Sequence, residues 1–128
     1  AFTDTCVLLG EAAQEQADTN PANTIFAPQR LIGDTFANPF VKCYMRQWPS
    51  NVVRSKDDKP LIKVCDRGKE RFLRPEEIVT LLLVHLRRHA EKFLGVTVME
   101  AVVAVPGQYG RHQREAICAA CRGARLNV

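Results

Sequence analysis

The segment RPEEIVTLLLVHLRRHAEKFLG, residues 74–95, constrains the fold most, because it carries the start and stop signals of a long amphipathic helix. Pro75 suits the first helical position, where its missing N–H would have no partner, and Gly95 suits the position after the last turn. Apolar residues recur at helical spacing, so one face is expected in the core while Arg87 and Glu91 face water. The expected core face consists of Ile78, Leu81, Leu82, His85 or Leu86, and Phe93.

The segment before this helix predicts an antiparallel meander. Residues 51–73, NVVRSKDDKPLIKVCDRGKERFL, contain three short apolar stretches separated by the polar turns SKDDKP and DRGK. Gly68 in the second turn fits a tight hairpin. Shorter elements are expected elsewhere: strands over residues 2–9 and in NTIF, residues 23–26, a helix over residues 11–18, and a short, half-buried helix that places Phe40, Val41, Tyr44 and Trp48 at helical spacing.

The C-terminal part predicts a buried strand and a helix. Residues 101–105 form a continuous apolar run, which is typical of a strand buried on both faces in a parallel or mixed sheet. RHQREAICAACRGA resumes as a helix, and RLNV resembles the first residues of another strand, so the sheet is expected to continue in further sequence. Together the elements indicate an α/β fold.

A short turn in NPANTIFAPQRLIG, residues 20–33, raises a functional question. A proline at its first position and a glycine past its end predict a helix of barely one turn, held in place by packing of Leu31 and Ile32. Its free N–H groups form a candidate anion site. Gln29 and Arg30 therefore either face a phosphate or belong to a capped connector.

Composition limits the classes of protein. The chain has 128 residues, of which 46% are hydrophobic, enough for one globular core, so a single domain or a piece of one is expected. The formal charge is +4, but basic and acidic residues alternate, as in RSKDDK, so nucleic-acid binding is not indicated. No apolar run is long enough to span a bilayer, and AFTDTCVLLG lacks the basic start of a signal peptide.

Cysteine and histidine spacing leaves a metal or redox hypothesis open. The odd, scattered set of cysteines favours reduced thiols, mostly small core residues, in a reducing compartment; it consists of Cys6, Cys43, Cys65, Cys118 and Cys121. Cys118 and Cys121 form a CxxC that could be a redox pair or half a zinc site, although core packing is the simpler interpretation. His85 and His89 share a helix face, but the glutamate of a metalloprotease motif is missing, so no metal site is expected.

These segments together resemble the nucleotide-binding domain of Hsp70 chaperones. AFTDT, NPANTIFAPQRLIG, QWPSNVV, PEEI, HAEKFLG, AVVAVPGQYGRHQREA and GARLNV are similar to family segments, in the same order and nearly end to end. The resemblance implies a partial actin-like ATPase fold, with the chain covering part of the first of two lobes. Residues 1–98 are expected to form mainly the outer subdomain, and residues 99–128 the start of the inner-subdomain sheet and helix.

The resemblance also implies an activity and partners. Family members bind ATP or ADP with Mg²⁺, hydrolyse ATP, and use the cycle to switch a C-terminal domain between states that bind and release unfolded polypeptides. J-domain co-chaperones and nucleotide exchange factors regulate the cycle, and no nucleic-acid or membrane partner is implied. A cytoplasmic location is expected, with other Hsp70 compartments left open. The family's phosphate loops lie outside this chain, so the chain alone is expected to bind nucleotide weakly.

Four positions carry the implied site. Gln29 stands where the family has a lysine that reaches the phosphates, and Arg30 matches the family's arginine beside the nucleotide. Pro106 and Arg114 match an interdomain switch proline and the arginine that relays it, although Pro106 could simply end a strand and Arg114 pair on a helix surface. Arg111 replaces an acidic residue that supports co-chaperone coupling. The alternative to an active chaperone is therefore a catalytically weakened scaffold that binds co-chaperones without ATP turnover.

Overall fold

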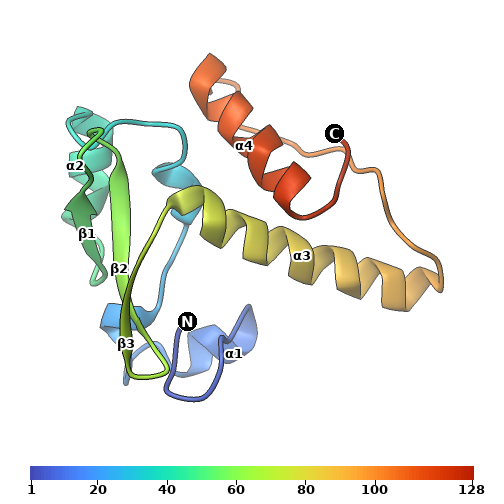
Figure 1. The fold of residues 1–128 in the computed structure, drawn as a ribbon, viewed down its shortest axis with the longest axis horizontal. Coiled ribbons are helices and arrows are strands. Elements are labelled where there is room, and N and C mark those ends of the chain that lie inside the picture. Colours follow the sequence, from blue (N-terminus) through green and yellow to red (C-terminus); the bar gives the residue numbers. More distant parts are fainter.

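A long helix runs outward from beside the three-stranded sheet, with another helix along one side of it and the N-terminal segment along the other (Figure 1). The computed structural model describes all of residues 1–128. The long helix is α3, Pro75–Leu94; a three-stranded sheet and α2 lie near its start, and α4 lies along one side. The other elements are α1 (Glu11–Glu15), α2 (Pro39–Met45), α4 (Arg111–Gly123), β1 (Asn51–Arg54), β2 (Pro60–Asp66), β3 (Lys69–Leu73) and two 3₁₀ turns, η1 (Pro21–Asn23) and η2 (Pro28–Arg30).

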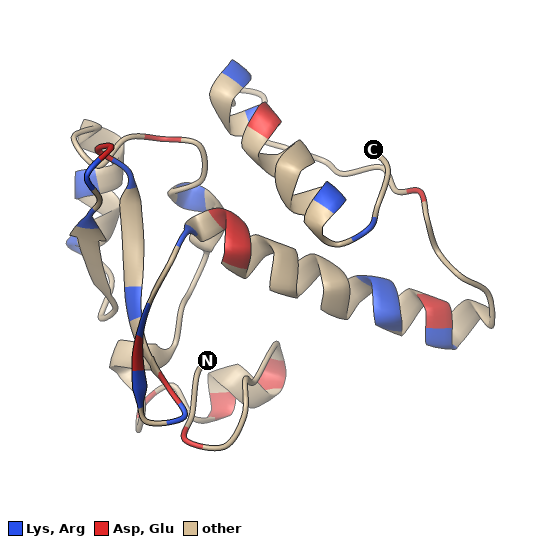
Figure 2. Ribbon diagram, in the orientation of Figure 1, with Lys and Arg blue, Asp and Glu red and all other residues tan.

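The antiparallel meander is confirmed. The strands pair in the order β1-β2-β3, with Val52 opposite Ile62 in the first pair. The hairpin between β2 and β3 has positive φ angles at both Arg67 (52°) and Gly68 (74°), the backbone that a two-residue hairpin turn requires. Basic and acidic residues are interspersed along the hairpin (Figure 2). The Nζ of Lys63 lies 2.8 Å from a carboxylate oxygen of Glu70.

The first core cluster lies between the sheet and the start of α3. Successive side chains of a strand point to opposite faces, so alternate residues of β2 face the same way. On β2 the inward residues include Ile62 and Val64, which are almost completely buried. This cluster consists of Phe2, Leu31, Val41, Ile62, Val64, Leu73 and Ile78.

The second core cluster lies between α3 and α4. It contains Ile32, Val79, Ile117, Ala120, Cys121, Ala124 and Leu126. Small residues let the helices approach: a Cβ on Gly123 would lie 3.0 Å from the Cγ2 of Thr80. The hydroxyl of Thr80 also lies 3.3 Å from the carbonyl oxygen of Ala120, so the crossing point is polar as well as tightly packed.

Two of the expected N-terminal strands are absent. Residues 2–9 form only one isolated bridge, between Phe2 and Val7, and residues 24–26 have no regular structure. The hydroxyl of Thr3 accepts a hydrogen bond from the backbone N–H of Cys6 at 3.0 Å, which closes a tight turn where the strand was expected. The helix expected over residues 11–18 is also shorter, because it ends at Glu15.

The prediction for residues 101–105 is wrong. The segment is not in a sheet, and its only ladder contact is a parallel bridge between the neighbouring Glu100 and Asn127. Exposure alternates along it, because Val103 packs on the second core cluster while Val102 is fully exposed. A continuous apolar run therefore has only one covered face in this chain.

The predicted core face of α3 is only partly correct. Ile78 is buried, but Leu86 is 63% and Phe93 is 90% exposed. Because α4 packs on the side that carries Val79, the covered face is rotated from the predicted one, and the Arg87 side chain is only 18% exposed. The predicted bounds are confirmed: Pro75 starts the helix, and Gly95, with a φ of 71°, ends it. No helix is both long enough and apolar enough to cross a bilayer.

We predict that Gly33→Ala destabilises the chain. Gly33 has a φ of 69°, and a Cβ there would lie 2.7 Å from the backbone of both His112 and Gln113 at the start of α4. A left-handed backbone costs a non-glycine residue about 1–2 kcal/mol, and the clash adds to it, so thermal denaturation should show a clear loss of stability. Gly107→Ala is the control, because nothing lies within 4 Å of a Cβ there. Equal melting temperatures for the two variants would contradict the prediction.

Candidate functional site

The turn η2 and the segment that follows Pro106 border one polar cleft. The cleft has a volume of about 630 Å³, and its lining residues include Gln29, Arg30, Asp34, Tyr44, Pro106 and Tyr109. Gln29 and Arg30 come from η2, whereas Pro106 and Tyr109 come from a loop about 80 residues later in the chain. Three of the four residues that the resemblance implied, Gln29, Arg30 and Pro106, therefore lie around the same space.

The turn η2 forms as its sequence predicts. Pro28 occupies the first position and is buried, and Ala27 before it has a left-handed φ of 49°. Leu31 and Ile32, directly after the turn, are completely buried, while Gln29 and Arg30 are exposed. The packing of two buried residues thus fixes a turn too short to be stable alone.

The backbone N–H groups of η2 and of the two residues after it are the candidates for the expected anion site. The amide of Arg30 donates to the carbonyl of Ala27 at 3.1 Å, that of Leu31 to Pro28 at 3.1 Å, and that of Ile32 to Gln29 at 3.4 Å. The turn itself therefore uses these N–H groups. The N–H of Gln29 makes no hydrogen bond within the protein, but a cluster of free N–H groups is not present, and the anion site stays a prediction.

Tyr109 joins the two sides of the cleft. Its hydroxyl donates a hydrogen bond of 2.7 Å to the carbonyl oxygen of Gln29. Desolvation by burial, and secondarily the charges of Asp34 and Tyr44, raise the pKa of Tyr109 above its usual value, so the hydroxyl stays protonated at neutral pH. Sequence reasoning missed this contact, and the only signal for it is an aromatic residue in an otherwise polar turn.

Asp34 makes a second connection across the cleft, which was also missed. One carboxylate oxygen accepts from the side-chain amide of Gln113 at 3.0 Å, and the other accepts from Asn38 at 2.9 Å. Gln113 in turn accepts from the backbone N–H of Gly110 at 3.0 Å, which ties the start of α4 to the same network.

Arg30 carries the positive charge of the cleft at its rim. Its guanidinium lies 5.0 Å from the ring centre of Tyr44, a separation typical of a cation–π contact. This contact directs the side chain toward α2. Arg30 lines the cleft, but its role toward a nucleotide remains a prediction.

Arg114 supports the loop that begins at Pro106. The N–H of Tyr109 donates to the carbonyl of Pro106 at 3.0 Å, which closes the loop, and the Nε of Arg114 donates to the carbonyl of Tyr109 at 2.9 Å. Arg114 and Pro106 are thus brought together, although Arg114 does not line the cleft. The ion pair on the surface of α4 is made instead by Arg111, whose Nε lies 2.7 Å from a carboxylate oxygen of Glu115. The switch role stays a prediction.

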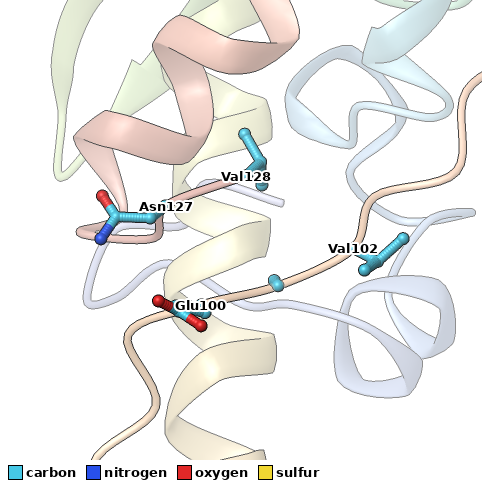
Figure 3. A pocket seen from close by; sticks show the side chains of 5 residues that line it. Glu100, Val102, Asn127 and Val128 are labelled. Carbon is cyan, nitrogen blue, oxygen red and sulfur yellow. The ribbon is translucent and has the colours of Figure 1, made fainter.

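A second hollow lies where the segment around Glu100 runs beside the last two residues (Figure 3). It has a volume of about 480 Å³ and is lined by Glu100, Ala101, Val102, Asn127 and Val128. The backbone N–H of Ala101 donates to the carbonyl of Asn127 at 2.9 Å, so the hollow follows the edge of the single parallel bridge. Its side chains are mostly apolar and form no catalytic constellation.

The cysteines differ from expectation. Cys6, Cys43 and Cys65 are exposed, so the prediction that most cysteines are core residues is wrong. Cys121 is buried, as core packing of the CxxC predicts, and burial raises the pKa of its thiol. Cys118, the other member of the CxxC, is only partly buried.

The two histidines of α3 are close but lack further metal ligands. The ring centres of His85 and His89 lie 4.3 Å apart. No group of three His, Cys, Asp or Glu side chains is arranged to hold a metal ion. The metal hypothesis therefore gains no support from the positions of these side chains.

The elements and the cleft define part of an α/β domain of the actin-like class, with an antiparallel meander beside a long helix. Comparison with protein families agrees: the family described as "Hsp70 protein" matches residues 1–128. The chain belongs to the Hsp70 family.

Curated relatives match along the whole chain or nearly so. "Heat shock 70 kDa protein 2" from Paracoccidioides lutzii is 45% identical over 128 residues, which are 100% of this chain and 19% of the relative. "Heat shock cognate 70 kDa protein 3" from Dictyostelium discoideum is 42% identical over 100% of the chain and 20% of the relative. "Putative heat shock 70 kDa protein 7" from Homo sapiens is 45% identical over 91% of the chain and 31% of the relative. The chain spans about a fifth to a third of the length of these relatives.

We predict that Cys6 reacts with iodoacetamide faster than an ordinary thiol at neutral pH. Hydrogen bonds from Thr3 and, secondarily, Thr5 lower the pKa of Cys6 and so increase the thiolate fraction. Thr5→Val removes one of these donors, whose hydroxyl lies 3.7 Å from the sulfur, and should slow alkylation at pH 7. Mass spectrometry of each thiol would measure this, with Cys43 and Cys65 as internal references. An unchanged rate at Cys6 would contradict the proposed cause.

Proposed function

We propose that the chain is part of the nucleotide-binding domain of a chaperone that binds ATP and couples its hydrolysis to the binding and release of unfolded polypeptides. Family membership supports the class, and one observation carries the proposal to this chain: Gln29, Arg30 and Pro106 line the same polar cleft. By the resemblance, these positions correspond to a phosphate-facing residue, its neighbouring arginine and an interdomain switch. A reducing compartment such as the cytoplasm suits its exposed free cysteines.

The cleft's side chains fit one edge of a nucleotide site. Arg30 supplies a guanidinium and Gln29 an amide, both able to donate to phosphate oxygens. The carboxylate of Asp34 accepts hydrogen bonds from the side-chain amides of Asn38 and Gln113, which fix its position. A bound ATP with Mg²⁺ supplies the phosphoryl group that is transferred to water. In this proposal the phosphate loops and the metal-associated carboxylates come from outside residues 1–128.

Gln29 determines how fast such a site works. In phosphoryl transfer the protein acts mainly by placing positive charge and hydrogen-bond donors where negative charge develops. A glutamine donates a hydrogen bond but adds no charge. We therefore propose nucleotide binding with slow hydrolysis.

A second candidate function is a scaffold that binds co-chaperones without turning over ATP. Two observations favour it: the neutral Gln29, and Arg111 on the exposed start of α4, where the resemblance implies an acidic residue. J-domain co-chaperones and nucleotide exchange factors remain the proposed regulators in the chaperone reading. If the chain is a scaffold, co-chaperones bind a surface at the start of α4 where Arg111 stands in place of the acidic residue that the resemblance implies.

We predict that Gln29→Lys, in the full-length protein, raises single-turnover ATP hydrolysis by on the order of tenfold to a hundredfold, because it restores a cation at the phosphate edge. Gln14→Lys is the matched control, since it adds the same charge on the exposed surface of α1. Hydrolysis that stays at background in both variants would reject the weakened-ATPase explanation and favour the scaffold.

We also predict that a polypeptide of residues 1–128 binds ATP weakly, because the cleft in these residues contains only one edge of the proposed site. Isothermal titration calorimetry, on material shown by circular dichroism to be folded, should detect no stoichiometric binding at micromolar ATP. Tight binding would show that the phosphate edge alone is sufficient and would overturn this division of the site.

A further inference from the structure

We propose that Tyr109 is a positioning residue for Gln29: its hydroxyl holds the carbonyl of Gln29 and thereby fixes the direction in which the Gln29 side chain enters the cleft. This role rests on the proposed function, because it matters for chemistry only if the cleft binds a nucleotide. The hydrogen bond itself, 2.7 Å long and joining residues 80 positions apart, is independent of that function.

Tyr109 is itself held in place on its own side of the cleft. Its N–H donates to the carbonyl of Pro106 at 3.0 Å, and its carbonyl accepts from the Nε of Arg114 at 2.9 Å. The aromatic ring lines the cleft and is half-buried. Because its N–H and its carbonyl are both held by hydrogen bonds, Tyr109 can restrain the carbonyl group that its hydroxyl binds. Arg114, Tyr109 and Gln29 therefore form a continuous chain of contacts from α4 to η2.

The turn that Tyr109 holds has few other restraints at Gln29. Within the turn, the carbonyl of Gln29 accepts from the backbone N–H groups of Leu31 and Ile32, the latter at a long 3.4 Å, which indicates a weak bond. The anchors Leu31 and Ile32 lie after the turn, not within it. Loss of the hydroxyl would therefore free the backbone at Gln29 while the core anchors stay in place.

Other contacts between the two segments should confine the effect of losing the Tyr109 hydroxyl to the backbone at Gln29. The carboxylate of Asp34 accepts from Gln113 at 3.0 Å, and Gly33 packs against the first turn of α4, so the two segments stay joined without Tyr109. Tyr109→Phe keeps the ring and removes only the hydroxyl. The variant is therefore expected to fold and to show a local change.

The first measurement is amide hydrogen exchange in the full-length protein with Tyr109→Phe. A hydrogen bond of this kind shifts a local equilibrium by roughly fivefold, so peptides covering residues 29–33 should exchange on the order of fivefold faster. Tyr44→Phe is the control, because it removes a hydroxyl from the same cleft without touching the carbonyl of Gln29. Equal exchange in wild type and Tyr109→Phe would overturn the proposal.

The second measurement separates positioning from a general loss of structure. In the Gln29→Lys background, Tyr109→Phe should lower kcat for ATP by on the order of fivefold with little change in KM, whereas with Gln29→Ala it should have no effect on kcat. An equal effect in both backgrounds would overturn the positioning role. A protein that binds no ATP, yet shows the faster exchange, would reject the proposed function and leave the hydrogen-bonded restraint of Gln29 standing.

Discussion

The structure depends on the burial of two consecutive residues, Leu31 and Ile32, in two different cores. Leu31 belongs to the cluster under the sheet, and Ile32 belongs to the cluster between α3 and α4; both are completely buried. Neighbouring side chains can enter different cores only if the backbone between them lies at the boundary. The segment from Pro28 to Gly33 is thereby fixed between the two halves of the chain, and α3 passes along both.

The position of the cleft follows from this boundary. Gly33, just after the buried pair, approaches the start of α4 so closely that a side chain would clash with the backbone of Gln113. That approach brings the loop after Pro106 beside η2, where Tyr109 and Gln29 meet. Residues far apart in the sequence thus line one space, because an apolar packing constraint holds the polar segments on either side of it.

Local signals in the sequence predicted the elements whose stability is local. Pro75 and Gly95 marked α3 correctly, and the turn at Gly68 marked the hairpin, because caps and turns depend on a few adjacent residues. The prediction of a strand at residues 101–105 was wrong because an apolar run does not determine whether one or both of its faces are covered by other elements. The hydrogen bond between Tyr109 and Gln29 could not be predicted from the sequence, because no local pattern encodes a contact between residues 80 positions apart.

In the proposed function, the electrostatics of the cleft give Gln29 a larger role than its exposure suggests. Among the 10 lining residues only Arg30 and Asp34 are charged, and their charges are opposite. A lysine in place of Gln29 would make this edge net positive, whereas glutamine leaves it balanced. In the proposed function, an anionic ligand would meet one cation, Arg30, at this edge and would otherwise be held by hydrogen bonds, which are more directional than the attraction between charges. In that proposal, groups that orient hydrogen-bond donors become more important at this edge, and the hydroxyl of Tyr109 holds the carbonyl of Gln29.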